Sequence, residues 1–249
     1  MNAKERIIVA VDVPTIKDKD VAATLRALAP YVGFFKIGLE LIAAGEADAA
    51  IKAVGEPSKV MFDIKLHDIP QTVENTIRRI AAKGVGMFTL HASGGHAMME
   101  AAARHCGKSV PLAVTVLTSM DEAACRLVYD RPPFVQVTGF ALMAIESGLD
   151  HVVCSAADIP AILNAEKGHQ RRLVKVTPGI RVDWGEGQRN DDQKRVLTPG
   201  RAVEAGADYL VIGRDIMQAE KRHRISPLEA VRRIGEEMQA AHLACGGTR

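Results

Sequence analysis

Short segments rich in β-branched residues alternate along this chain with longer segments of helical period, and this alternation constrains the fold more than any other feature. Such short segments predict strands, and apolar residues that recur every three or four positions predict amphipathic helices. The predicted strands are Ile7–Asp12, Gly33–Ile37, Val60–Lys65, Met87–His91, Leu112–Leu117, His151–Cys154, Leu173–Val176 and Tyr209–Ile212. The predicted helices are Lys17–Ala29, Glu40–Val54, Gln71–Lys83, Ala97–His105, Gly139–Ser147, Pro160–Lys167, Pro199–Ala205 and Pro227–His242, with a further short helix at Asp121–Val128. Alternating strands and helices imply a parallel sheet.

The number of strand–helix units favours closure of this sheet into a barrel. The chain has 249 residues, close to the roughly 250 residues of a typical (β/α)8 barrel. No linker rich in proline and serine and no low-complexity tract divides the sequence, and aromatic residues make up only 4% of it, so Ala, Val, Ile and Leu must build the core. We therefore expect the α/β class, with a single (β/α)8 TIM barrel domain over residues 1–249.

Two of the predicted helices carry clear start signals. Thr198 and Ser226 are each followed directly by a proline. A hydroxyl side chain can accept a hydrogen bond from the first helical turn, and proline suits the first helical position because its missing N–H has no partner there. We expect helices to begin at Pro199 and Pro227.

The composition argues against several other classes of protein. The 32 basic and 30 acidic side chains leave a net charge of +2, without the basic excess of a nucleic-acid-binding domain. The four cysteines form no C-x-x-C pair, so zinc and redox motifs are not expected. The sequence has no signal-peptide pattern near its start and no apolar stretch of about 18 residues. We expect a soluble cytoplasmic protein that binds neither nucleic acid nor membranes.

The third predicted strand carries two charged residues in a pattern typical of a functional site. Side chains alternate between the two faces of a strand, so Asp63 and Lys65 share one face while Phe62 and Ile64 share the other. The large apolar side chains should pack against the helices. Asp63 and Lys65 are then expected to point into the mouth of the barrel.

Two further charges occupy corresponding positions on the neighbouring strands. Asp12 ends the first predicted strand and Lys36 lies near the end of the second. Charges of alternating sign should therefore converge at the barrel mouth. Because burying an unpaired charge is very costly, we expect these side chains to pair with one another. A salt bridge at the barrel rim would explain any one of them alone. The full set, at the end where such barrels place their chemistry, favours a catalytic site.

The segment from Asp63 to Pro70, followed by Thr72, resembles the D-x-K-x-x-D-I-P-x-T signature of the orotidine 5′-phosphate decarboxylase family in its bacterial form. The D-x-K-x-x-D part is shared with sister decarboxylases and aldolases, but the combination of motifs is specific. Further similarity to the family lies in Phe35–Gly38, Thr115–Met120, Val152–Ala156, Thr177–Arg181 and Val211–Arg214, in the expected order over nearly the whole chain.

The resemblance implies a reaction and its catalytic residues. The family converts orotidine monophosphate to uridine monophosphate and carbon dioxide, without a metal or another cofactor. A catalytic charge chain of Lys36, Asp63, Lys65 and Asp68 is implied, in which Lys65 stabilises negative charge at C6 and then donates a proton to that carbon. Asp63 would crowd the substrate carboxylate, and Asp12 and Lys36 would hold the ribose hydroxyls.

The resemblance also implies substrate-binding residues and a partner. Asp68 and Thr72 would reach the active site of a neighbouring subunit, so a homodimer with shared sites is expected. Thr118 would contact the pyrimidine, and Gly213 and Arg214 the phosphate. Arg181 and Gln193 would close over phosphate and base.

The segment between Arg181 and Gln193 is longer than in many bacterial members. Residues 182–192 intervene and include a second glutamine, Gln188. The match around Gln193, which continues to Thr198 and Pro199, favours Gln193 as the residue that caps the substrate. The polar, glycine-containing segment is typical of a loop that closes on binding.

Two rival functions remain open at this stage. A sister enzyme acting on a sugar phosphate would share Asp63, Lys65 and Asp68 but would use magnesium, for which Glu40 is the nearest additional acidic residue. A catalytically silent nucleotide-binding protein on the same scaffold would be expected to lack the lysine or its aspartate partner. The matches at Thr118 and further along the chain favour the nucleotide enzyme.

Overall fold

The computed structural model describes residues 2–169, 171–184 and 197–246, and within these residues eight parallel strands close into a barrel. The strands pair in chain order, and β1 pairs with both β2 and β8. Their bounds are β1 Ile7–Ala10, β2 Phe34–Gly38, β3 Val60–Leu66, β4 Met87–His91, β5 Val110–Val114, β6 His151–Val153, β7 Val174–Thr177 and β8 Tyr209–Ile212. The predicted (β/α)8 barrel is confirmed.

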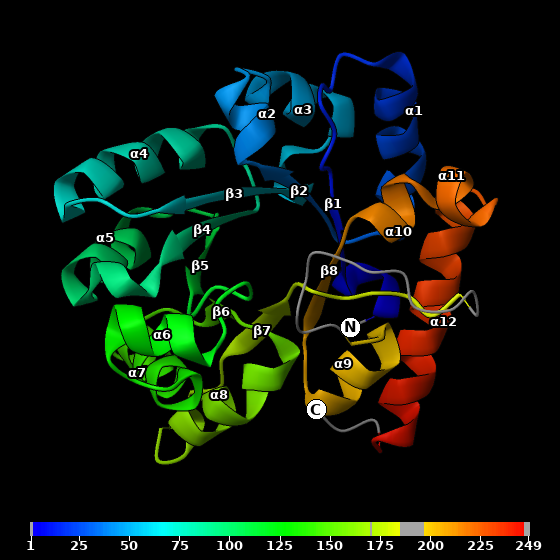
Figure 1. Ribbon diagram of the computed structural model, residues 1–249. Helices are drawn as coiled ribbons and strands as arrows, with labels where there is room; N and C mark the ends of the chain where they lie inside the picture. Colours follow the sequence, from blue (N-terminus) through cyan, green and yellow to red (C-terminus); the bar gives the residue numbers. More distant parts are fainter. Residues whose placement is uncertain (1, 170, 185–196, 247–249) are drawn as a thin grey trace.

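Helices surround the strands on the outside of the barrel (Figure 1). Their bounds are α1 Lys19–Leu28, α2 Leu39–Ala43, α3 Ala47–Val54, α4 Pro70–Ala82, α5 His96–His105, α6 Glu122–Tyr129, α7 Pro133–Glu146, α8 Ile159–Glu166, α9 Pro199–Ala205, α10 Arg214–Met217, α11 Ala219–His223 and α12 Pro227–Ala244. Short 3-10 turns occupy Ala3–Arg6, Ala29–Tyr31, Pro57–Lys59, Ala92–Gly94 and Ala156–Asp158. Among the described residues, none of these helices combines the length and the apolar character that a bilayer-spanning segment needs.

The core has two layers because strand side chains alternate between the two faces of the barrel wall. One layer fills the barrel interior, and the other lies between the strands and the helices. Ile7 and Val9 of β1 belong to the outer layer, as does Phe62 of β3. The interior layer consists of Ile8, Ala10, Met61, Met87, Leu112, Val176 and Val211. The interior position of Met61 puts Asp63, two residues later, on the inward face toward the mouth.

The predicted single helix Glu40–Val54 is wrong, because the chain forms α2 and α3 with a turn between them. Gly45 has φ +73°, a left-handed conformation that glycine adopts without steric cost. The N–H of Glu46 donates to the carbonyl of Leu41, and this bond ends α2. The Glu46 carboxylate, 6% exposed, in turn accepts from the N–H of Ile16 at 2.7 Å and ties the loop after β1 to this turn.

Two other predicted elements have clearly displaced boundaries. The helix expected at Gly139–Ser147 begins earlier, at Pro133, which occupies the first helical turn. The fifth strand starts before its predicted range, since the N–H of Val110 already donates to the carbonyl of Gly86. It ends at Val114, so the residues that follow form a loop at the barrel mouth. The starts expected at Pro199 and Pro227 are confirmed, with caps by Thr198 and Ser226.

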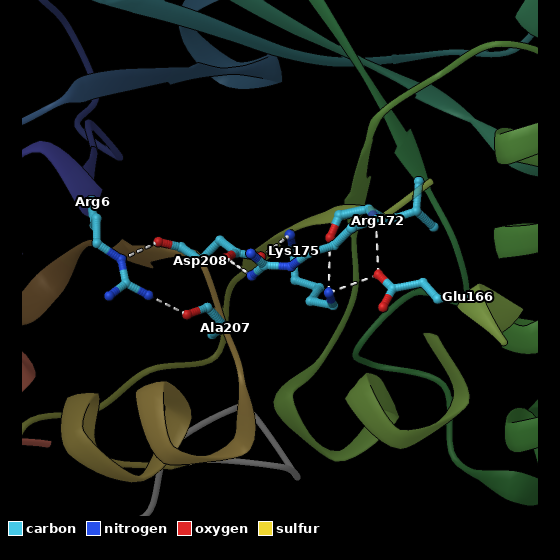
Figure 2. A network of polar contacts seen from close by, with 7 residues as sticks. Arg6, Glu166, Arg172, Lys175, Ala207 and Asp208 are labelled. Atoms are coloured by element: carbon cyan, nitrogen blue, oxygen red, sulfur yellow. Dashed lines mark hydrogen bonds and ion pairs between the residues drawn. The ribbon is translucent and has the colours of Figure 1, made fainter. Parts of the chain in front are cut away.

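A polar network joins β7, β8 and the start of β1 at the amino ends of these strands (Figure 2). Lys175 is 1% exposed, and its ammonium group lies 2.8 Å from both the Glu166 carboxylate and the carbonyl of Leu173. Asp208 accepts from the N–H of Lys175 at 2.9 Å. The Arg6 guanidinium donates to the carbonyl of Asp208 at 2.6 Å. The network therefore ties the last strands to the first at the closing seam of the barrel.

We expect Lys175→Met to destabilise the protein by about 3 kcal/mol, because it leaves the Glu166 carboxylate largely buried without its cation. Adding Glu166→Gln in the same chain should restore much of the loss. Urea unfolding measures both effects. The control is Arg232→Met, which removes exposed ion pairs on α12 and should cost less than about 1 kcal/mol. Equal losses for Lys175→Met and the control would contradict this account of the network.

Candidate active site

A cavity of about 440 Å³ opens at the carboxyl ends of the strands. This volume lies within the ~300–1,000 Å³ typical of small-molecule sites. In a (β/α)8 barrel this end carries the chemistry. The cavity is lined by Ala10, Asp12, Lys36, Met61, Asp63, Lys65, Val114, Val116, Leu117, Thr118, Val153, Pro178, Gly179, Arg181, Val211, Gly213, Arg214 and Gln218. Its floor is apolar and its rim carries the charges.

Charged side chains of alternating sign run across one wall of this cavity. Lys36 Nζ lies 3.1 Å from Asp12 Oδ1 and 3.5 Å from Asp63 Oδ2. Lys65 Nζ lies 2.8 Å from Asp63 Oδ1. The predicted convergence of Asp12, Lys36, Asp63 and Lys65 is confirmed, while the role of each in a reaction stays a prediction.

Asp63 is the centre of this arrangement and its carboxylate is held in the ionised form. Burial acts most strongly on it and opposes ionisation. The charges of Lys36 and Lys65, together with hydrogen bonds from Lys65 and Thr89, outweigh burial, so the pKa of Asp63 lies below its ordinary value. Its two carboxylate oxygens serve different lysines. A deprotonated Asp63 thus keeps both ammonium groups in fixed positions.

Lys65 reaches this position through an irregular stretch of β3 and not through simple alternation. Its φ is +46°, in the left-handed region that residues with a Cβ seldom adopt. The pairing of β3 with β4 shifts between Phe62 and Leu66, as in a β-bulge. Bulges of this kind re-aim a side chain next to a functional site. The prediction that Asp63 and Lys65 both point into the barrel mouth is correct, but strand alternation alone does not explain the position of Lys65.

Other predicted residues lie around the same cavity on segments that directly follow strands, and Arg214 begins α10. Thr118 follows β5, Arg181 follows β7, and Gly213 and Arg214 follow β8. A Cβ at Gly213 would lie 3.3 Å from the Ala10 Cβ and 3.4 Å from Asp12 Oδ2. Only glycine therefore leaves this corner of the cavity as open as it is.

Two predicted residues are not brought into the cavity of this single chain. Asp68 and Thr72 are exposed, at the loop after β3 and in the first turn of α4. The Asp68 carboxylate accepts from the N–H of Ile69 at 2.7 Å. Gln193 and the alternative Gln188 lie outside the described residues. The predicted contribution of Asp68 and Thr72 to a neighbouring subunit stays a prediction.

Sequence reasoning missed two polar residues at the site. Gln218 lines the cavity just after α10, and only its distance from Arg214 along a helix could have indicated it. Thr89 of β4 is 1% exposed and hydrogen-bonds to Asp63. Its signal is its spacing from Met87, which places it on the inward face of the barrel.

The beginning of the loop after β7 is anchored beside Arg214. Asp215, the next residue, is 3% exposed and accepts from the N–H of Val182 at 2.9 Å. The Trp184 and His223 rings lie in contact, with centroids 4.9 Å apart and planes inclined by 30°. The chain is therefore held in place as it leaves the cavity.

Fold and cavity together define a class: a (β/α)8-barrel enzyme with a charged site at the carboxyl ends of its strands. Comparison with known proteins narrows this class. The model of the orotidine 5′-phosphate decarboxylase / HUMPS family matches residues 5–230. The chain belongs to this family.

Individual relatives agree with the family match. An orotidine 5′-phosphate decarboxylase of Moorella thermoacetica is 42% identical over an alignment of 254 positions, gaps included, that covers 96% of this chain and 94% of that one. A second orotidine 5′-phosphate decarboxylase, from Anaeromyxobacter sp. (strain K), is 44% identical over 222 residues, and the match covers 88% of this chain and 94% of that one. The crystal structure of orotidine 5′-phosphate decarboxylase from Lactobacillus acidophilus superposes with a TM-score of 0.74 at 29% identity, over 93% of this chain and 98% of that one.

The lowered pKa of Asp63 predicts a pH-dependent contribution to stability. A carboxyl whose folded pKa is depressed stabilises the fold above its unfolded pKa, ~3.9 for aspartate, and this contribution is lost as pH falls toward the folded pKa. The stability advantage of the wild type over Asp63→Asn should therefore shrink between pH 6 and pH 3. Urea unfolding across this range measures it. A constant difference between the two proteins would contradict an ionised, paired Asp63.

Proposed function

We propose that the chain decarboxylates orotidine 5′-monophosphate to uridine 5′-monophosphate and carbon dioxide, the last step of de novo synthesis of uridine monophosphate. The observation that carries this proposal is the Lys65 ammonium group, held 2.8 Å from Asp63 at the wall of the cavity. The relatives that match nearly the whole chain are named for this activity.

The reaction needs a fixed positive charge beside one carbon atom. When carbon dioxide leaves, the bond between C6 and the carboxylate breaks and its electron pair stays on C6. This pair lies in the plane of the pyrimidine, so the ring cannot delocalise it. Lys65 would stabilise the pair by its charge and then transfer a proton from Nζ to C6. Preorganised charge of this kind is usually the largest contribution to catalysis.

Asp63 serves the same step in two ways. It fixes Lys65, and its own charge stands beside the position that the substrate carboxylate would take, which favours departure of carbon dioxide. Two unit charges 4 Å apart interact by ~4 kcal/mol at an effective dielectric of 20. Ordinary enzymes lower barriers by up to ~23 kcal/mol. Interactions with the rest of the nucleotide must therefore contribute too.

The remaining cavity residues suit the other parts of the nucleotide. Asp12 and Lys36 would hold the ribose hydroxyls, and Thr118 would contact the pyrimidine. Arg214 presents a planar guanidinium that can bind phosphate oxygens with two parallel hydrogen bonds. Gly213 leaves room for the phosphate beside it. Arg181, at the start of the anchored loop, would close over the phosphate together with Gln193.

The chemistry proposed needs no cofactor, since Lys65 supplies both the charge and the proton. Sister enzymes of the same superfamily that act on sugar phosphates use magnesium. Their additional acidic candidate, Glu40, is exposed on α2 and, of the described residues, is not one that lines the cavity. The curated relatives also favour the nucleotide enzyme.

We expect Lys65→Ala to lower kcat on the order of 10³-fold or more, because it removes both the stabilising charge and the proton donor. The loss of ultraviolet absorbance as orotidine monophosphate is consumed measures turnover. Binding of uridine monophosphate, followed by calorimetry, should remain detectable. Near-wild-type turnover in this variant would eliminate the proposed acid.

Two controls separate the rival functions. Wild-type activity should persist in excess chelator, whereas loss of activity that magnesium restores would favour a sugar-phosphate enzyme. A wild-type protein that binds uridine monophosphate but leaves orotidine monophosphate unchanged would be a catalytically silent binding protein.

We further propose that two copies of the chain share their active sites. Asp68, Ile69 and Thr72 project from the loop after β3 and the start of α4, and Ile69 is 66% exposed despite its apolar side chain. An apolar side chain of this size, flanked by polar ones, suits a contact with a second copy. Asp68 would then complete the charge chain beside Lys65 of its neighbour.

Mixing two inactive variants tests the shared sites. In a heterodimer of Lys65→Ala and Asp68→Ala subunits, one site carries both lesions and the other carries neither. Random reassortment should therefore restore about a quarter of the wild-type activity. Activity that stays at the level of the separate variants, under conditions where subunits exchange, would show that Asp68 acts within its own chain or not at all.

We also propose a cytoplasmic location, which cysteine chemistry supports. Cys106, Cys125, Cys154 and Cys245 form no disulfide bond, and burial raises the pKa of Cys154 to about 12, so that thiol is inert. Free thiols suit a reducing compartment, which supports a cytoplasmic location.

A further inference from the structure

A single hydroxyl group, that of Thr89, contacts both residues of the central charge pair. Thr89 Oγ1 donates to Asp63 Oδ1 at 3.0 Å. The same oxygen accepts from the backbone N–H of Lys65 at 2.9 Å. Thr89 is 1% exposed and, of the described residues, is not one that lines the cavity. Whatever it does for the reaction, it does through Asp63 and Lys65.

The strand pairing explains why this hydroxyl is needed. Phe62 pairs with Phe88 and Leu66 pairs with Leu90, so the three residues from Asp63 to Lys65 face Thr89 alone. The Lys65 N–H thus finds a side-chain oxygen in place of a ladder carbonyl. A buried N–H without a partner costs about 1–3 kcal/mol. The hydroxyl therefore stabilises the left-handed backbone of Lys65, which has φ +46°.

The hydroxyl also fixes the rotation of the Asp63 carboxylate. Oδ1 accepts from Thr89 and from Lys65, whereas Oδ2 faces Lys36 at 3.5 Å. A carboxylate rotated by a quarter turn about its Cβ–Cγ bond could not serve both lysines in this way, whereas a half turn only exchanges its two equivalent oxygens. Thr89 has one proton to donate and gives it to Oδ1, so it selects the orientation in which Oδ2 is left for Lys36.

We propose that Thr89 is a positioning residue for the decarboxylation, one that holds the Lys65 ammonium in register with C6 through the Lys65 backbone and the Asp63 carboxylate. This inference rests on the proposed function. The proposal gives a residue of β4 a role in a site whose other residues come from other strands and from the segments that follow them.

Substitutions that differ by one oxygen atom test the proposal. Thr89→Val keeps the shape of the side chain and removes the hydroxyl, and we expect kcat to fall about 10- to 100-fold, as a displacement of reacting groups near 1 Å would cause. KM for orotidine monophosphate should change little, because Thr89 does not reach the cavity. Thr89→Ser should retain kcat near the wild-type value. Thr89→Ala differs from the serine variant only by the missing oxygen, and its kcat should drop as far as that of Thr89→Val.

Thr115→Val is the matched control. Thr115 is also 1% exposed and its hydroxyl donates to the carbonyl of Val153 at 2.9 Å, a carbonyl that already accepts from the Thr115 N–H. This variant should keep kcat, since its hydroxyl contacts neither charged residue. Circular dichroism and binding of uridine monophosphate establish that each variant is folded.

The outcomes separate the two proposals. A wild type that turns over orotidine monophosphate, with Thr89→Val or Thr89→Ala within twofold of its kcat, would overturn the role of Thr89 and leave the proposed function intact. The same holds if Thr89→Ser falls as far as Thr89→Ala, or if Thr115→Val falls as far as Thr89→Val. A wild type without turnover would instead overturn the proposed function. Should Thr89→Val fail to fold, the serine and alanine pair carries the comparison alone.

Discussion

The Asp63 carboxylate, held between two lysines in the mouth of the barrel, is the interaction on which the site depends. Burying one carboxylate in such a place is costly, and burying an ammonium group beside it is costly again. The attraction between the carboxylate and the ammonium groups offsets these two costs. Further hydrogen bonds join Thr89 to Asp63 and Lys36 to Asp12, as a charge pair removed from water requires. Their mutual dependence fixes Lys65 in one position before any substrate enters.

The barrel makes this arrangement possible by separating stability from chemistry. Below the charges, the interior layer around Met61 and Val211 is apolar and closely packed. At the opposite end, Lys175 and its partners join the seam between the last strands and the first (Figure 2). The carboxyl end can therefore hold a strained backbone at Lys65 and several partly buried charges. This division is general in (β/α)8 barrels, where conserved polar residues at the upper end belong to the reaction.

The barrel and most of its charged wall could be predicted from sequence because both follow from periodicity. Strand alternation placed Asp63 inward, and strand ends placed Asp12 and Lys36 beside it. Alternation could not predict the bulge that re-aims Lys65, since a bulge depends on pairing between strands distant in sequence. Alternation from Met87 does place Thr89 on the inward face, but its contacts with Asp63 and Lys65 depend on the same pairing between strands. The break at Gly45 was missed because a helical pattern continues on both sides of it, and only tertiary contacts of Glu46 decide for a turn.

Proton exchange at C6 tests most directly whether the Lys65 ammonium group faces a negative charge at that carbon. By microscopic reversibility, a lysine that protonates C6 of the product can also remove the C6 proton. Uridine monophosphate incubated with the wild type in deuterium oxide should lose its C6 proton signal in the NMR spectrum, and Lys65→Ala should abolish this exchange. Exchange at an undiminished rate in the variant would contradict the account.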